Sequence, residues 1–289
     1  MIQVENLSFS YGKSGGFSLK DISFSVAPGE IFGFLGPSGA GKSTLQKILV
    51  GLLRGWKGHA LVAGCDMRSP GRDFAQRIGV DFEFPSLYGK LTALENLEFF
   101  ASLYKKRARS PRELLALVGL EAEADKRVAA YSKGMKSRLN FVKALSHGPE
   151  LLFLDEPTSG LDPANARIMK NIIRAERDRG AAVILTTHNM HDAAELCDRV
   201  AFIVDGEIRA LDNPRALVMS KGAARIDYSW FEDSEGGTRR EEYAHSALAE
   251  SGKDSRLQDL VARGALASIH SSEPTLEDVF VEVTGRALT

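Results

Sequence analysis

The stretch Gly36-Pro37-Ser38-Gly39-Ala40-Gly41-Lys42-Ser43-Thr44 decides the fold of this chain. It matches the phosphate-binding pattern G-x-x-x-x-G-K-[ST] at every fixed position. Glycines in such a loop let consecutive backbone N–H groups turn towards a phosphate, and side chains there would block its approach. Lys42 would place a positive charge on the outer phosphates of a nucleotide, and Ser43 would bind Mg²⁺.

The segments on either side supply the context that this loop requires. The apolar run Ile31-Phe32-Gly33-Phe34-Leu35 predicts a buried strand that leads into the loop, and residues 44–50 predict a helix that leaves it. The N-terminus of that helix carries partial positive charge, which favours a bound phosphate.

The composition is that of an ordinary globular protein. The 289 residues are 44% hydrophobic and 26% charged, with a net charge of -1, which gives no electrostatic footprint for nucleic acid. No apolar run approaches the roughly 18 residues that span a bilayer, and the first residues lack a signal-peptide pattern. We therefore expect a cytoplasmic protein without a nucleic-acid partner. Cys65 and Cys197 lack metal-ligand spacing, so we expect reduced packing thiols.

The chain divides by pattern into a core and an appendage. Residues 2–35 are β-rich, residues 84–148 contain helical patterns alone, and strands alternate with helices further on. Such alternation predicts a mostly parallel sheet with helices on both faces. We predict an α/β fold of the P-loop NTPase class over residues 1–220, with an N-terminal antiparallel β subdomain and a helical insertion at 84–148. Residues 221–289 form a small C-terminal α+β appendage.

Two acidic residues follow a second apolar run in Leu151-Leu152-Phe153-Leu154-Asp155-Glu156. A buried strand that ends in carboxylates delivers them to the same edge of the sheet as the phosphate loop. Asp155 would hold Mg²⁺, and Glu156 would orient and polarise the attacking water. Loop, metal ligand and water-orienting group are the parts that phosphoryl transfer requires, so the sequence predicts Mg-dependent ATP hydrolysis.

Four further motifs occur in a fixed order along the chain. They are Phe9-Ser10-Tyr11-Gly12, Tyr131-Ser132-Lys133-Gly134-Met135, Ser159-Gly160-Leu161-Asp162, and His188 after a β-type run. With these motifs the chain resembles the nucleotide-binding subunits of ATP-binding-cassette (ABC) transporters over residues 1–220. The resemblance implies that Tyr11 stacks on adenine, with a core tyrosine as the alternative. It also implies that His188 contacts the γ-phosphate.

The resemblance further implies a head-to-tail homodimer that holds two ATP molecules at its interface. Ser132 and Gly134 of one subunit would face the γ-phosphate bound by Lys42 of the other, and Asp162 belongs to the loop that completes this arrangement. A hydroxyl, a backbone N–H and a helix N-terminus all favour an anion. ATP would then bridge two surfaces, and its hydrolysis would remove the bridge.

Three residues depart from the family pattern. Glu83 stands where the family has Gln, so we expect it to keep metal binding but to slow hydrolysis or strengthen its Mg²⁺ dependence. Lys133 replaces Gly in the signature, either as an additional cation for ATP across the interface or as a solvent-exposed side chain. Met135 replaces Gln, which we expect to be tolerated.

The biological role rests on the partner that this chain would require. As part of a transporter it must dock on a separate membrane-spanning permease, and the apolar segment Phe84-Pro85-Ser86-Leu87-Tyr88 would form a groove for it, with core packing as the alternative. The ending Pro274-Thr275-Leu276-Glu277-Asp278-Val279-Phe280 is similar to that of multidrug exporter subunits, so we expect export. The alternative is a soluble ABC ATPase that acts as a regulatory, ribosome-associated or nucleic-acid-associated switch.

Overall fold

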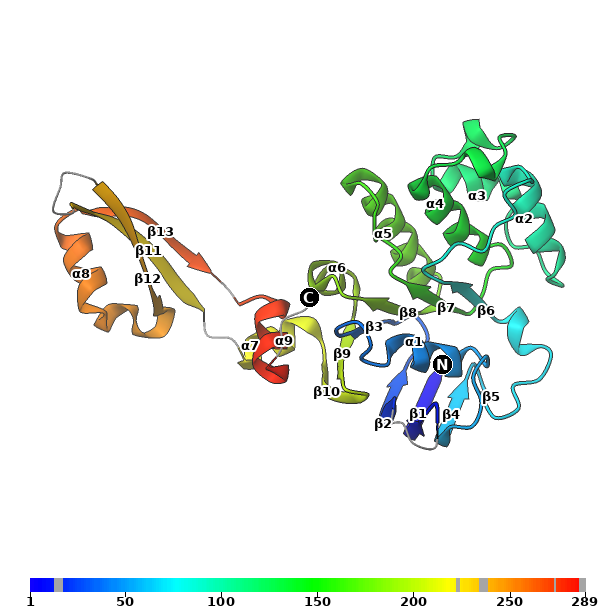
Figure 1. The fold of residues 1–289 in the computed structure, drawn as a ribbon, viewed down its shortest axis with the longest axis horizontal. Helices are drawn as coiled ribbons and strands as arrows, with labels where there is room; N and C mark the ends of the chain where they lie inside the picture. The colour runs from blue at the N-terminus through cyan, green and yellow to red at the C-terminus, as the bar shows by residue number, and fades with distance from the viewer. Residues whose placement is uncertain (13–17, 222–223, 234–238, 273, 286–289) are drawn as a thin grey trace. The chain divides into compact units, whose positions relative to one another are not determined.

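A computed structural model describes residues 1–12, 18–221, 224–233, 239–272 and 274–285 (Figure 1). The chain forms two compact units, Met1–Pro214 and a second unit that begins at Arg215. The sequence placed the boundary between core and appendage at residue 220, and the two units are described separately below.

A small antiparallel sheet opens the first unit, in the strand order β2-β1-β4-β5. Its strands are β1 (Ile2–Phe9), β2 (Leu19–Val26), β4 (Lys57–Val62) and β5 (Cys65–Asp66). In β1 and β2 buried and exposed residues mostly alternate, as expected for a sheet with one face in the core. The start of β2 was predicted at Phe17, which lies outside the described residues.

The main sheet has six strands in the order β10-β9-β3-β8-β7-β6. They are β3 (Ile31–Leu35), β6 (Ile78–Asp81), β7 (Leu151–Asp155), β8 (Ala182–Thr187), β9 (Arg199–Val204) and β10 (Glu207–Asp212). Strands β9, β3, β8, β7 and β6 run parallel, and β10 pairs antiparallel with β9. Strand β3 is buried along its whole length, as its continuous apolar run predicted, and β8 is buried along its whole length as well.

Helices α1 (Lys42–Leu49), α5 (Pro163–Asp178) and α6 (Met190–Leu196) follow β3, β7 and β8. The two sheets share one core with α1, in which the rings of Phe24, Phe32 and Phe34 contact one another at centroid distances of 5.0–5.4 Å. Cys65 and Cys197 are free thiols, and Cys197 is buried against Gly33, where an added Cβ would lie 2.7 Å from its sulfur. Burial raises the pKa of Cys197, as expected for a packing thiol.

Three helices that gather at the β6 side of the main sheet form the predicted helical insertion (Figure 1). They are α2 (Ala93–Ser102), α3 (Pro111–Leu117) and α4 (Lys133–Ala144). Thr92 and Glu95 form the predicted capping box of α2, and Ser110 and Glu113 form a second one at α3.

The basic run at residues 105–109 lies in the loop between α2 and α3, and two of its side chains form ion pairs. Lys105 pairs with the exposed Asp73 at 2.6 Å. Arg109 instead reaches Glu176 on α5 at 2.5 Å, and the side chain of Glu176 is 1% exposed. Arg179 also pairs with Glu176, at 2.6 Å. Because a buried carboxylate needs opposite charge, Arg109 serves to join the helical insertion to α5.

The second unit contains a three-stranded antiparallel sheet in the order β12-β11-β13. Its elements are α7 (Pro214–Lys221), β11 (Arg225–Asp233), β12 (Arg239–Ala247), α8 (Ser255–Ala262), β13 (Leu266–Ser272) and α9 (Leu276–Thr284). Tyr228 and Trp230 on β11 pack against Leu257 and Leu260 on α8. The side chains of Leu276, Val279 and Phe280 on α9 are buried, so this apolar stripe serves as packing within one chain.

His147, which follows α4, fixes the end of the helical insertion on β6. Its ring stacks on Tyr104 at a centroid distance of 3.7 Å, and its Nε2 donates to the carbonyl of Ile78 at 3.0 Å. The buried Nδ1 has no partner among the described residues, which fits a neutral ring. Burial lowers the pKa of His147 to about 4, although the bond to Ile78 partly opposes that shift.

This buried histidine predicts acid-sensitive stability. The unfolded chain takes up a proton near the ordinary pKa of about 6.5 and the folded chain near 4, so stability is lost as pH falls through that window. We expect a loss of about 2 kcal/mol between pH 7 and pH 5 in urea unfolding, and a His147→Phe variant should lack it. Equal pH dependence in both proteins would contradict this prediction.

Candidate functional site

The topology places the predicted motifs at one edge of the main sheet. Strand β8 lies between β3 and β7, and the three run parallel, so the segments that follow them start side by side. A cavity of about 780 Å³ lies at this edge. Its lining includes these predicted site residues: Tyr11, Ser38, Gly39, Ala40, Gly41, Lys42, Ser43, Thr44, Glu83, Asp155, Glu156 and His188.

The phosphate loop is held against the sheet by two glycines. Gly36 has a φ of 157°, and an added Cβ would collide with the carbonyl oxygen of Ile203 on β9. Gly41 has a φ of 109°, and its added Cβ would lie 2.7 Å from the carbonyl oxygen of Ser18. The two glycines are therefore required by packing of the loop on its own protein, a reason that the sequence pattern did not reveal.

Lys42 lies at the start of α1 with its amine over the loop. Its Nζ donates to the carbonyls of Gly36 at 2.5 Å and of Pro37 at 3.1 Å. Burial lowers the pKa of Lys42, while the charges of Glu156 and Asp155 oppose that shift. Within the described part of the chain no side chain caps this end of α1, so its first N–H groups suit an anion.

Asp155 ends β7 and is hydrogen-bonded across the sheet. The hydroxyl of Thr186 on β8 donates to its Oδ1. Burial raises the pKa of Asp155, the bond from Thr186 lowers it, and the nearby charge of Glu156 raises it again. A cation at this position would relieve the cost of two adjacent carboxylates.

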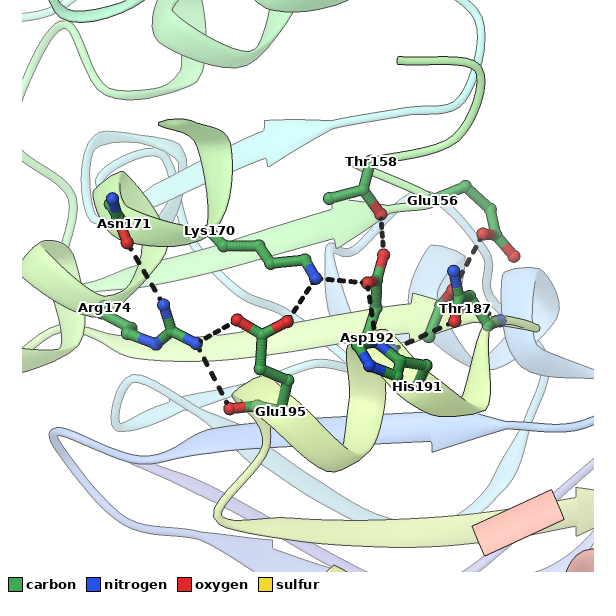
Figure 2. Close-up of polar contacts among 10 residues, drawn as sticks. Glu156, Thr158, Lys170, Asn171, Arg174, Thr187, His191, Asp192 and Glu195 are labelled. Carbon is green, nitrogen blue, oxygen red and sulfur yellow. Dashed lines mark hydrogen bonds and ion pairs between the residues drawn. The ribbon is translucent and has the colours of Figure 1, made fainter. Parts of the chain in front are cut away.

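Glu156 is held by the end of β8. Its φ of 50° lies in the left-handed region, and its backbone N–H donates to the carbonyl of Thr186 at 2.9 Å. Its Oε2 accepts from the hydroxyl of Thr187 at 3.0 Å (Figure 2). Its Oε1 accepts from the backbone N–H of His188 at 2.9 Å and lies 2.7 Å from the Nδ1 of the same residue. This strained turn and three contacts fix the carboxylate beside the cavity.

Tyr11 lies at the cavity with its ring 63% exposed. It contacts Phe9 edge to face at 4.8 Å, and its hydroxyl lies 3.2 Å from Oγ1 of Thr44. It is therefore not a core tyrosine, and its exposed ring face is suited to stacking on a base.

The signature residues do not line this cavity. Ser132 is the N-cap of α4, with its hydroxyl accepting from the backbone N–H of Met135 at 3.2 Å. Gly134 lies in the first turn of the same helix, and Asp162 is the exposed N-cap of α5. Ser132, Gly134 and Asp162 therefore lie at the starts of two helices, outside the cavity of their own chain.

Lys133 is solvent-exposed, as one of its two alternatives predicted, and it also lines a groove that the sequence did not predict. The groove has a volume of about 100 Å³, and Glu83, Asp155 and Glu156 of the same chain line it as well. Glu83 and Lys133, the two charged departures from the family pattern, therefore line the same groove.

Several residues of the cavity were missed from the sequence. They are Ser18, Lys20, Asp205 and Gly206, while Ser159 was named within a motif but not as a cavity residue. Asp205-Gly206 forms the turn between β9 and β10, and Gly206 joins the phosphate loop through its N–H bond to Ala40 at 3.1 Å. An Asp-Gly pair between two apolar runs is a hairpin signal, which would have marked the turn but not its neighbours.

The donor set at the cavity fits Mg²⁺. Ser43, Glu83 and Asp155 offer a hydroxyl and two carboxylates, which are the hard oxygen ligands that Mg²⁺ prefers. Cavity size, glycine loop, buried lysine and carboxylates together suit a nucleotide triphosphate with its metal.

Comparison with known proteins agrees with this arrangement. Residues 19–159 match the family model described as ABC transporter. The chain is 50% identical to the fluoroquinolones export ATP-binding protein of Mycobacterium tuberculosis, over 100% of this chain and 95% of that protein. It is 34% identical to the linearmycin resistance ATP-binding protein of Bacillus subtilis, over 100% and 99%.

A solved structure supports the same assignment. An ATP-binding cassette described as dimeric, in a post-hydrolysis state and bound to ADP and Pi, matches with a TM-score of 0.67 and 25% identity, over 74% of this chain and 98% of that one. The predicted P-loop α/β fold and the predicted class, an ABC-type ATPase, are thereby confirmed. This chain belongs to the family of ABC transporter ATP-binding proteins.

The packing of the loop generates a direct test. Gly36→Ala should lower the free energy of unfolding by about 3 kcal/mol, because the new methyl group meets the carbonyl of Ile203. Gly39→Ala is the matched control: its φ is 80°, but an added Cβ meets nothing within 4 Å, so it should cost about 1 kcal/mol. If urea unfolding shows equal losses of unfolding free energy for the two variants, packing against Ile203 is not the reason for glycine at position 36.

Proposed function

We propose that this chain binds and hydrolyses Mg-ATP to power a membrane exporter. The observation that carries the proposal is the gathering of Lys42, Asp155, Glu156 and His188 around one cavity. The relatives named for fluoroquinolone export and linearmycin resistance support export as the direction.

The proposed roles follow from the chemistry of each group. Lys42 and the N–H groups of the phosphate loop neutralise the β- and γ-phosphates, while the exposed face of Tyr11 stacks on adenine. Ser43, Asp155 and Glu83 would hold Mg²⁺, which would supply positive charge that offsets the charge of the phosphates. The backbone groups of residues 36–44 form the remainder of the phosphate cradle.

In the proposed reaction Glu156 accepts a hydrogen bond from water and aligns it with the γ-phosphorus. The water oxygen bonds to phosphorus as the bond from phosphorus to the ADP oxygen breaks, and the products are ADP and phosphate. His188, whose Nδ1 lies 2.7 Å from Oε1 of Glu156, would form a hydrogen bond to a γ-phosphate oxygen in this proposal. Positioning and charge stabilisation supply most of the catalysis in such a transfer.

The site is completed by a second copy in this proposal. Ser132 to Met135 and Asp162 lie outside their own cavity, at the exposed starts of α4 and α5. In a head-to-tail homodimer they would approach the γ-phosphate held by the partner, where a helix N-terminus and a hydroxyl favour an anion. The dimeric cassette to which this chain is similar supports that arrangement.

The proposed membrane partner would dock on an aromatic patch near the site. Phe84 is 79% exposed and Tyr88 51% exposed, and the ring of Tyr88 contacts Phe99 at 5.1 Å and Phe100 at 5.8 Å. Exposed apolar clusters of this kind suit a protein interface. No described helix is both long enough and apolar enough to cross a bilayer. We therefore assign the patch to a separate permease at the cytoplasmic face of the membrane.

The role of Glu156 predicts a trapped state. Glu156→Gln keeps the shape of the side chain but not its negative charge, so ATP turnover should fall at least about a hundredfold while ATP binding persists. With hydrolysis blocked, a dimer should accumulate in size-exclusion chromatography with Mg-ATP. Lys42→Ala is the control, since it should lose both binding and dimer. A variant that binds Mg-ATP and stays monomeric would count heavily against the homodimer.

The charge of Glu83 predicts an altered metal response. Glu83→Gln removes a negative charge from the surroundings of the γ-phosphate, so turnover should rise about threefold or half-saturation should shift in a Mg²⁺ titration. Glu121→Gln, an exposed change in the helical insertion, is the control and should alter neither quantity. If the Glu83 variant also alters neither, the carboxylate has no influence on hydrolysis.

A further inference from the structure

A buried ion pair on two neighbouring helices takes no part in the roles proposed above. Lys170 on α5 and Asp192 on α6 lie with Nζ and Oδ1 2.5 Å apart, and each side chain is 10% exposed (Figure 2). A buried pair of this kind gains little stability over apolar residues of similar size. Its presence is better explained by the contacts that the pair makes on either side.

The second oxygen of Asp192 reaches the loop that follows Glu156. The hydroxyl of Thr158 donates to Oδ2 of Asp192 at 2.6 Å (Figure 2). Thr158 is half-buried, whereas Ser159 and Gly160 beside it are exposed. One carboxylate thus joins the loop 157–161 to α5 and α6, and a hydrogen bond to an ionised acceptor is about twice as strong as a neutral one.

A second route connects Asp192 to Glu156. The backbone N–H of Asp192 donates to Oδ1 of Asn189 at 3.0 Å, and the backbone N–H of Asn189 donates to Oγ1 of Thr187 at 3.0 Å. The same hydroxyl of Thr187 donates to Oε2 of Glu156 at 3.0 Å. The start of α6 therefore lies between the carboxylate of Glu156 and the loop that follows it.

Further ion pairs surround Lys170 on the side away from Thr158. Lys170 also pairs with Glu195, and Arg174 pairs with Glu195 at 2.6 Å. Burial alone would lower the pKa of Lys170, but its bonds to Asp192 and Glu195 outweigh burial and raise it. His191, Asp192 and Glu195 have metal-ligating atoms within 4.8 Å of one another. Because both carboxylates are already paired with cations, this cluster is an ion-pair network and not a metal centre.

We propose that Asp192 is a positioning residue for ATP hydrolysis. Held by Lys170, it fixes the loop 157–161 through the hydroxyl of Thr158, and with it the placement of Glu156 and of the exposed residues up to Asp162. The proposal rests on the function proposed for Glu156. It predicts that Thr158 and Asp192 affect kcat more than the binding of ATP. The reason is that, in the described part of the chain, neither residue lines the nucleotide cavity.

Steady-state ATPase assays on a set of variants test this inference. Thr158→Val and Asp192→Ala should each lower kcat about tenfold with KM for ATP changed less than about twofold, because the loop 157–161 shifts while the phosphate loop does not. Thr158→Ser keeps the hydroxyl and should restore the parental kcat. The double variant of Thr158→Val and Asp192→Ala should be no slower than Asp192→Ala alone, since both changes remove the bond between Thr158 and Asp192.

The matched control is Glu195→Gln, which alters the same helix and the same lysine but leaves the bond between Thr158 and Asp192 in place. It should keep the parental kcat within about twofold. A parental kcat in Thr158→Val, an equal loss in Thr158→Ser, or additive losses in the double variant would each overturn the proposal.

A second measurement separates this proposal from the proposed function. In hydrogen–deuterium exchange of the full chain without nucleotide, a peptide that covers residues 157–162 should exchange faster in Thr158→Val than in the parent and in Thr158→Ser. If the parent protein shows no ATP turnover, the proposed function is contradicted. The exchange measurement would still show whether the hydroxyl of Thr158 holds the loop 157–161. Unchanged exchange in Thr158→Val would overturn the anchor itself.

Discussion

The hold that the end of β8 has on Glu156 is the interaction on which the rest of the site depends. Thr187, the backbone N–H of His188 and its ring all contact one carboxylate that directly follows β7. This is possible because β8 pairs with both β7 and β3 in the parallel sheet. The order of these three strands therefore brings the phosphate loop, the acidic pair and the histidine to one edge of the sheet, although their motifs are far apart in the sequence.

The same arrangement explains where strain and buried charge are found. Glu156 adopts a left-handed backbone conformation, and Asp155 beside it is half-buried with a raised pKa. Lys42 lies near both carboxylates with a pKa lowered by burial. Such groups are costly for a folded chain, and they are concentrated where a nucleotide and its metal would balance their charges. A network of paired charges around Lys170 and Asp192 connects α5 and α6 to the loop that follows Glu156, and it is suited to keeping that loop in place.

Much of the fold and the site could be predicted from the sequence, since both depend on local patterns. The continuous apolar runs of β3 and β7 indicated buried strands, and the spacing of glycines and Lys42 indicated the phosphate loop. What the pattern did not reveal are contacts between distant segments. The reason for Gly36 lies on β9 at Ile203, the partner of Arg109 lies on α5, and Lys133 lines a groove with Glu83. These contacts depend on how the helical insertion and the sheets pack, which no local period encodes.

The central claim is that one chain supplies the water-orienting carboxylate and the phosphate loop of a single site. The measurement that tests it most directly is a crystal structure of the protein with Mg²⁺ and a non-hydrolysable ATP analogue. The account predicts the γ-phosphate in hydrogen-bond contact with Lys42, and a water between that phosphate and the carboxylate of Glu156. An analogue bound elsewhere, or bound at the loop with Glu156 unable to reach a water at the γ-phosphate, would contradict it.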